Sequence, residues 1–199
     1  MTNSKKFKKS LFIFRQDLRL DDNSALHAAL SQSQEIFPVF FFDPQILQKF
    51  PKPDARLGFL IDALHALDTQ LQKFGSRLRV FHADPTQKIP ELAQARDFDA
   101  IFRNTSYGRG AATRDRQIRD RANQNSISLV STPDFLLVEP RELPTRKVFS
   151  PFFKLRSRHL AQNPPAQPRI FSDQFSQIPT PKNPEKISGK TSGKNSEKN

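Results

Sequence analysis

The stretch Leu11-Phe-Ile-Phe-Arg-Gln-Asp-Leu-Arg-Leu-Asp-Asp-Asn23 predicts a buried β-strand, a polar turn and the start of a helix. Its first four residues are apolar, which suits a short strand covered on both faces. Charged residues follow, and Asn23 is a preferred N-cap for the apolar-rich segment after it. A strand, a polar turn and a helix form the opening unit of a parallel α/β sheet. In such sheets, ligands bind where strands end and helices begin.

The rest of the chain repeats this alternation. Further strands are predicted at residues 36–42, 78–82, 100–103 and 128–131. The clearest helix is predicted at 54–74, where apolar residues recur three or four apart in one continuous stripe, with Asp54 as its cap and Gly75 as its end. Pro38 should lie at the beginning of its strand or face away from a partner. The pattern predicts an α/β fold: a Rossmann-like, doubly wound, five-stranded parallel sheet with helices on both faces and its loops converging on one rim.

Composition narrows the classes of function. The 199 residues carry a net charge of +12, but residues 10–140 hold sixteen basic and sixteen acidic side chains, so the excess lies at the ends. A neutral body predicts DNA contact that is at most weak. The chain has no cysteine and four scattered histidines, so we expect no metal site. No apolar run reaches the roughly 18 residues of a membrane span, and the expected location is the cytoplasm.

A family resemblance starts in the opening stretch. Residues 14–23, Phe-Arg-Gln-Asp-Leu-Arg-Leu-Asp-Asp-Asn, resemble the first signature of the DNA photolyase and cryptochrome family, with Ile13 in place of the usual tryptophan. Later blocks resemble the same family, and the resemblance covers residues 10 to about 160: these blocks are Arg56 to Gly75, Asp84-Pro85, Asn104 to Asp115, and Val148 to Lys154. It implies the light-harvesting, or antenna, α/β domain of that family.

The resemblance also implies a binding site, for which we name no catalytic residue. The residues expected to bind a cofactor lie in three strand-end loops: Arg15, Asp17, Asp43, Asn104, Tyr107 and Gly108. Glycine at 108 and 110 would allow a flat ligand to come close, or would simply allow a tight turn. The opposed charges between Arg15 and Asp22 have a structural alternative, a salt-bridged loop that fixes geometry without touching a ligand.

The ligand itself stays open at this point. Pterin-binding relatives carry an acidic anchor at the positions of Gly110 and Ala111, and deazaflavin-binding relatives carry acids near Ser106 and Gly108. Neither set of carboxylates is present. The resemblance therefore leaves a flavin, a folate, a deazaflavin or no antenna chromophore, whereas FAD is not expected on this chain.

The domain limits follow from composition. We expect a basic N-terminal extension at 1–9, the α/β domain at 10–160, and a disordered Pro/Lys/Ser-rich tail at 161–199 with one docking point at Ile170, Phe171 and Phe175. We expect the family's FAD-binding domain to be absent, and the sequence has no tryptophan for an electron relay. Three readings remain: a truncated or split antenna domain working with a separately encoded FAD-binding photolyase domain, a nucleotide- or flavin-binding module without a light role, and a non-functional gene fragment.

Overall fold

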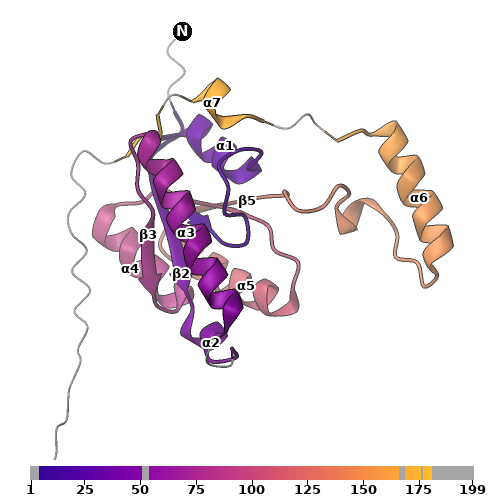
Figure 1. The fold of residues 1–199 in the computed structure, drawn as a ribbon, viewed down its shortest axis with the longest axis horizontal. Helices are drawn as coiled ribbons and strands as arrows, with labels where there is room; N and C mark the ends of the chain where they lie inside the picture. The colour runs from indigo at the N-terminus through magenta and orange to yellow at the C-terminus, as the bar shows by residue number, and fades with distance from the viewer. Residues whose placement is uncertain (1–4, 51–53, 166–168, 176, 181–199) are drawn as a thin grey trace, which may run out of the picture.

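The fold is built on a five-stranded parallel sheet. The computed structural model describes residues 5–50, 54–165, 169–175 and 177–180. Within them the strands take the order β3-β2-β1-β4-β5 (Figure 1). Their bounds are β1 Phe7–Phe14, β2 Ser33–Phe42, β3 Arg79–His82, β4 Ala100–Asn104 and β5 Ser128–Thr132. The predicted Rossmann-like sheet is confirmed, and its chain order reverses between β1 and β4, which is where such folds bind ligands.

Helices follow the strands as the alternation predicted. Their bounds are α1 Ser24–Gln32, α2 Pro44–Leu47, α3 Ala55–Lys73, α4 Pro85–Arg96, α5 Arg109–Gln124, α6 Phe149–Gln162 and α7 Phe171–Gln174, with a short 3-10 helix, η1, at Pro140–Glu142. The structure confirms the helix caps that the sequence predicted at Asn23 and Asp54. The side chain of Asn23 accepts from the backbone N–H of Leu26, and that of Asp54 accepts from Arg56. Gly75 follows α3 with φ +75°, the left-handed conformation that glycine tolerates best.

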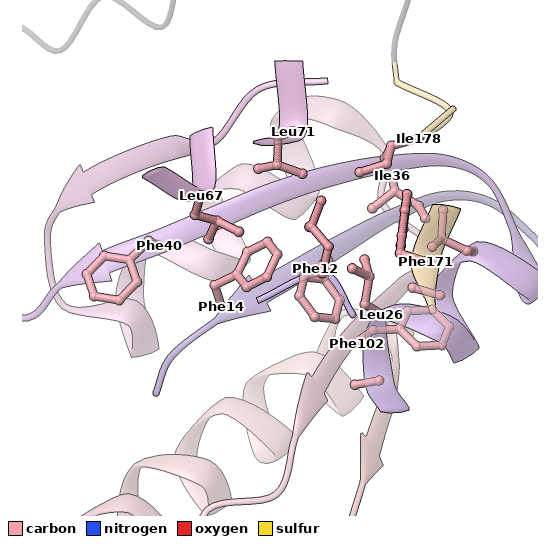
Figure 2. Close-up of a cluster of buried hydrophobic side chains, with 14 of the residues drawn as sticks. Phe12, Phe14, Leu26, Ile36, Phe40, Leu67, Leu71, Phe102, Phe171 and Ile178 are labelled. Carbon is pink, nitrogen blue, oxygen red and sulfur yellow. The ribbon is translucent and has the colours of Figure 1, made fainter. Parts of the chain in front are cut away.

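The sheet is covered on both faces, so two apolar cores form. One core packs α1 and α3 against β1, β2 and β4, and Figure 2 shows its side chains, among them Phe12, Phe14, Phe102, Leu26 and Leu67. The other core packs α4 and α5 against the opposite face. The near-continuous apolar runs of β1 and β2 are explained by this double covering.

Helix α3 departs from the continuous stripe expected of it. Its second half buries Leu64, Leu67 and Leu71, whereas Leu57 and Leu60 in its first half are half-buried and Ile61 is 41% exposed. The stripe is therefore fully buried only in the C-terminal half of the helix. Pro38 lies inside β2 opposite Phe12, not at the beginning of the strand. The pairing of β2 with β3 starts one residue later, at Val39, which agrees with the second predicted position, one that faces away from a partner.

The first strand begins earlier than the sequence indicated. Phe7 is 6% exposed and its ring meets that of Phe102 edge-on, with centroids 5.8 Å apart. The backbone N–H groups of Lys8 and Lys9 donate to the carboxylate of Asp99 at 2.7 and 3.0 Å. Residues 7–9 of the predicted N-terminal extension therefore belong to the sheet. The extension's first four residues lie outside the described part of the chain.

The segment after α6 differs from the disordered tail that was predicted at 161–199. Phe171 and Ile178 are 1% and 2% exposed and join the core beneath α1 and α3 (Figure 2). Backbone N–H groups of Asp22 and Ile36 donate to the carbonyls of Arg169 and Pro179 at 2.7 and 2.6 Å. Docking is therefore confirmed for Phe171 and Phe175, whereas Ile170 of the predicted docking point is 45% exposed. Disorder is wrong for 169–175 and 177–180. The composition of the tail did not reveal this docking, because a few apolar residues are enough to anchor a segment when the core has space for their side chains. The rest of that prediction, at 166–168, 176 and 181–199, lies outside the described residues.

Helix α6 has a different environment from the other long helices. The chain leaves β5 in an extended path, and Figure 1 shows α6 standing apart from the sheet. It has no buried residue, and Phe149 and Phe153 are 74% and 50% exposed. The α/β body thus ends at β5, and the segment from 169 returns to it.

Candidate functional site

A cavity of about 250 Å³ opens at the carboxyl ends of β1, β2 and β4. Its wall takes residues from three of the predicted strand-end loops and from the first turns of α5: it consists of Ile13, Phe14, Arg15, Gln16, Phe40, Phe41, Ile46, Pro85, Ser106, Ala111, Arg114 and Ile118. The expected convergence of the loops on one rim is thereby confirmed. A parallel sheet brings these loops together because all its strands end at the same edge.

Two guanidinium groups supply the charge in this wall. Arg15 donates from Nη2 to Oδ1 of Asp115 at 2.5 Å, and Arg114 donates from Nη1 to Oδ2 of Asp43 at 3.2 Å. Each guanidinium keeps one buried nitrogen without a hydrogen-bond partner among the described residues, Nη1 of Arg15 and Nε of Arg114. Both cations are therefore fixed from one side by a carboxylate while part of their donor capacity is unused.

Asp17 and Asn104 are not in the wall of the cavity. They form the centre of a buried hydrogen-bond network beside it. Asp17 is 1% exposed and accepts from the backbone N–H of Arg15 at 2.8 Å and from the side-chain amide of Asn104 at 2.5 Å. Asn104 also donates to Oδ1 of Asn23 at 2.9 Å and accepts from the backbone N–H of Ala25 at 3.0 Å. These bonds tie the β1 loop, the N-terminus of α1 and the end of β4 together.

A buried ion triad continues the network toward α5. The guanidinium of Arg103, which is 1% exposed, and that of Arg15 both pair with Oδ1 of Asp115. Burial alone raises the pKa of Asp115, but hydrogen bonds and charges from Arg15 and Arg103 outweigh it and hold that pKa below its usual value. The site residues chosen from the sequence did not include Arg103 or Arg114. Arg114 nevertheless belongs to the block from Asn104 to Asp115 that resembles the family, whereas the signal for Arg103 was only its position next to Asn104.

The remaining predicted site residues are not in the wall of the cavity. Asp43 caps α2 by accepting from the backbone N–H of Gln45 at 2.9 Å, and its other oxygen holds Arg114. Tyr107 is 38% exposed, and its hydroxyl donates to the carboxylate of Glu139. Gly108 precedes α5 with φ −71°, and a Cβ added there meets nothing within 4 Å. The backbone conformation at Gly108 therefore does not require glycine for a tight turn.

The charged loop after β1 is not held by salt bridges within itself. Its two arginines reach partners about a hundred residues away: Arg15 pairs with Asp115, and Arg19 pairs with Asp134 at 2.6 Å. The expectation of an internally salt-bridged loop is thus wrong in its pairing, although the loop is rigidly held. The acids of the loop accept backbone N–H groups instead, as Asp17 does from Arg15 and Asp21 does from Phe171.

The described residues contain neither a cluster of metal-ligating side chains nor a helix that could cross a membrane. No group of three or more histidine, cysteine, aspartate or glutamate side chains there is arranged to hold a metal ion. None of the helices in the same part of the chain is both long enough and apolar enough to cross a membrane.

Comparison with known proteins gives one consistent result. The family model described as DNA photolyase matches residues 10–169. The deoxyribodipyrimidine photo-lyase of a Synechococcus species is 34% identical over 168 residues, which are 82% of this chain and 35% of that protein. An archaeal photolyase structure from Sulfolobus tokodaii superposes with a TM-score of 0.71 and 32% identity, covering 81% of this chain and 36% of the other.

A second similar structure covers more of the chain. The class III photolyase of Agrobacterium tumefaciens superposes with a TM-score of 0.77 and 25% identity over 92% of this chain and 37% of that one. The chain therefore spans about a third of the length of the relatives it matches. The match covers the α/β sheet, the cavity at its carboxyl edge and helix α6. On this evidence the chain belongs to the DNA photolyase family and carries that family's N-terminal α/β domain.

Proposed function

We propose that this domain holds a planar, light-absorbing chromophore in the cavity at the carboxyl edge of its sheet and serves as an antenna-type domain for light-dependent DNA repair. The observation that carries the proposal is the cavity itself, which lies at the reversal of strand order and combines an apolar wall with two guanidinium groups. Apolar clefts with a few fixed polar groups are the usual form of cofactor sites.

The shape and lining of the cavity favour one flat ring system. Phe14, Phe40 and Phe41 offer aromatic surface, and Ile13 and Ile118 offer aliphatic surface. A volume of about 250 Å³ is near the lower limit of the roughly 300–1,000 Å³ of typical ligand sites. Such a space suits the ring of a flavin, folate or deazaflavin, with the remainder of the molecule outside. The similar Sulfolobus tokodaii structure is described as containing two FAD molecules and as implying a novel light-harvesting cofactor, which supports a chromophore at this domain.

We further propose that the domain does not catalyse repair alone. The family's lyase chemistry uses a bound FAD and an electron relay, and this chain has no tryptophan from which such a relay could be drawn. A separately encoded FAD-binding domain is the proposed partner, and the unpartnered apolar side chains of α6 are available for contact. Contact with DNA would be weak, because residues 10–140 carry equal numbers of acidic and basic side chains. The proposed location is the cytoplasm.

A ligand titration with a matched pair of variants tests the binding proposal. The purified full chain would be titrated with FMN, methenyl-tetrahydrofolate and an 8-hydroxydeazaflavin while ligand absorption and fluorescence are followed. Ala111 lines the cavity and its neighbour Ala112 is exposed on the same helix. Ala111→Trp should abolish binding by filling the cavity, and Ala112→Trp should leave it unchanged. Absence of binding by all three chromophores would refute the proposal.

The light role needs a separate measurement. Excitation of the bound chromophore should produce energy transfer to the flavin of a co-purified FAD-binding partner. Chromophore binding without such transfer would instead favour a flavin- or nucleotide-binding module that has no light role.

A further inference from the structure

We infer that the amino edge of the sheet, which is the edge away from the cavity, is a contact surface for the phosphate backbone of duplex DNA. The equal numbers of acids and bases along residues 10–140 do not show where those charges lie in space. The choice of DNA rests on the proposed function, whereas the surface itself shares no residue with the cavity wall. This amino-edge surface consists of seven cations at the starts of β1 and β3 and at the end of α4: Lys5, Lys6, Lys8, Lys9, Arg77, Arg79 and Arg96.

The start of β1 lies against the end of α4. The backbone N–H groups of Lys8 and Lys9 donate to the carboxylate of Asp99 at 2.7 and 3.0 Å, and the N–H of Asp99 donates to the carbonyl of Lys9 at 2.9 Å. Asp99 comes three residues after Arg96, which is in the last turn of α4. Figure 1 shows the start of the described chain at the end of the sheet opposite α2, the helix that follows the carboxyl end of β2. The lysines and Arg96 therefore belong to the same edge.

Three arginines gather beside this contact. The guanidinium carbons of Arg79 and Arg96 lie 4.8 and 5.0 Å from the centre of the Phe37 ring. Nη1 of Arg79 donates to the carbonyl of Arg77 at 2.8 Å. Burial, and then the charges of Arg96 and Arg77, lower the pKa of Arg79 below its ordinary value. An anion placed beside these like charges would relieve their repulsion.

The cations of the amino-edge surface have no carboxylate partners. Within the described chain none of the seven forms a salt bridge, whereas the two arginines of the cavity wall each do. Asp99 is engaged by backbone N–H groups, and Asp68 accepts from the backbone N–H of Leu78 and the amide of Gln72. Seven cations against four acids leave a charge of +3. Those four acids are Glu35, Asp68, Asp97 and Asp99.

The opposite edge of the sheet has the opposite sign. Four loops lead from the carboxyl end of a strand into the next helix, and together they carry five aspartates and two arginines. A chain that is neutral by count is therefore polarised across its sheet, and a polyanion is attracted to the amino edge and repelled from the other. The four loops are residues 15–23, 43, 83–84 and 105–108.

The surface suits DNA better than a membrane. Proteins that lie on a membrane combine basic side chains with large apolar ones that enter the lipid. Among the exposed large apolar side chains of the described chain, only Val80 belongs to β1, β3 or α4. Lysine and arginine without apolar neighbours bind phosphates and release the counterions of the duplex.

Binding of a fluorescently labelled DNA duplex to the full chain, followed by anisotropy at several salt concentrations, tests this surface. Each phosphate contact contributes about −0.9 to the slope of log affinity against log salt. Contacts by about four of the cations should therefore lower the affinity about a hundredfold between about 50 and 200 mM salt. Two duplexes of unrelated sequence should bind equally, because phosphate contacts carry no sequence information. Affinity that does not depend on salt would overturn the inference.

Double variants locate the contact. Lys8→Gln with Arg77→Gln removes two exposed cations from two segments, and it should reduce the fall in affinity over the same salt range to about tenfold. Lys8→Arg with Arg77→Lys keeps both charges and should bind as the wild type does. Arg109→Gln with Arg116→Gln is the matched control, because it removes the same charge from exposed positions on α5. Equal losses in the two glutamine variants would overturn the inference, since net charge alone would then explain the binding.

Two other sources of binding have their own tests. Five lysines follow residue 180 in the sequence, and a variant with glutamine at all five should still respond to Lys8→Gln with Arg77→Gln; loss of all DNA binding in that variant would overturn the inference. The five are Lys182, Lys186, Lys190, Lys194 and Lys198. Binding to vesicles of phosphatidylserine and phosphatidylcholine without binding to DNA would overturn it as well, in favour of a lipid surface.

The chromophore proposal can fail independently of this one. Ala111→Trp fills the cavity and should leave DNA affinity and its salt dependence unchanged, because Ala111 is in the cavity wall and outside the amino-edge surface. Salt-dependent DNA binding by a chain that binds no chromophore would support the surface and refute the antenna role. Chromophore binding by a chain that binds no DNA at low salt would do the reverse.

Discussion

The side-chain amide of Asn104, the last residue of β4, donates a hydrogen bond of 2.5 Å to the carboxylate of Asp17 in the loop after β1. Both residues are buried, at 2% and 1% exposure. The bond joins the two loops that flank the reversal of strand order, where the cavity lies. It shows that part of the strongest sequence signature supports the shape of the site and does not line it.

Replacing Asp17 should therefore affect stability before it affects binding. Asp17→Ala leaves the backbone N–H of Arg15 and the amide of Asn104 buried without their acceptor, and we expect a loss of about 2–4 kcal/mol in the free energy of unfolding. Urea denaturation would measure this loss. Asp62→Ala is the control, because Asp62 is exposed and should change stability by less than about 0.5 kcal/mol. Unchanged stability together with lost chromophore binding would instead assign Asp17 to the ligand.

The returning segment should contribute strongly to stability. Phe171 is 1% exposed, and its ring lies 4.6 Å from that of Phe74 at the end of α3. Phe171→Ala should lower the free energy of unfolding by about 3–5 kcal/mol, as truncation of a buried phenylalanine does. Phe149→Ala is the matched control, since Phe149 is 74% exposed and should change it by less than about 0.5 kcal/mol. Equal effects of the two substitutions would contradict the docking of residues 169–175.

Acid should weaken the contact between α1 and that segment. Burial, and then the nearby charge of Arg169, lower the pKa of His27 below its ordinary value of 6.5, and its ring packs edge-on against Phe175 with centroids 5.0 Å apart. A lowered pKa means that the folded state favours the neutral ring. The resulting stability is present above pH 6.5 and is lost as the pH falls through the lowered pKa.

Denaturation at a series of pH values would measure this dependence. His27→Gln should flatten the fall in stability below pH 6.5, because glutamine does not titrate. His65→Gln is the control, since His65 is exposed on α3 and should leave the dependence intact. A wild-type profile that the His27 substitution does not alter would rule out this residue as the source.

The single tyrosine should ionise only in strong alkali. Burial, and then the hydrogen bond to Glu139, raise the pKa of Tyr107 well above its ordinary value of 10.0. Ultraviolet titration can follow it without overlap, because the chain has one tyrosine and no tryptophan. Above pH 10 the unfolded tyrosine loses its proton while the folded one keeps it, so stability should fall. Glu139→Gln should bring the midpoint closer to 10, and an unshifted wild-type midpoint would contradict the contact.

Much of the sheet could be predicted because its signals are local. A buried strand such as residues 11–14 shows as an apolar run, and caps such as Asn23 and Asp54 show as residue types at a strand or helix boundary. The candidate site was predicted only in outline. Its loops were named, but Arg114 and Ser106, which line the cavity, were not among the chosen residues, whereas Asp17 and Asn104 were chosen and lie outside its wall. Residue type in a loop does not reveal which side chains turn inward.

The sequence alone determined the order of strands and helices, the family and the edge of the sheet at which a ligand would bind, because each depends on short patterns and on the handedness of parallel crossovers. Only the tertiary structure decided the partners of the charges and the fate of the segment from 169 to 180. Arg15 pairs with a carboxylate a hundred residues later, and Phe171 is buried by α1 and α3. Such contacts depend on the distance between side chains in space, which spacing along the chain does not encode.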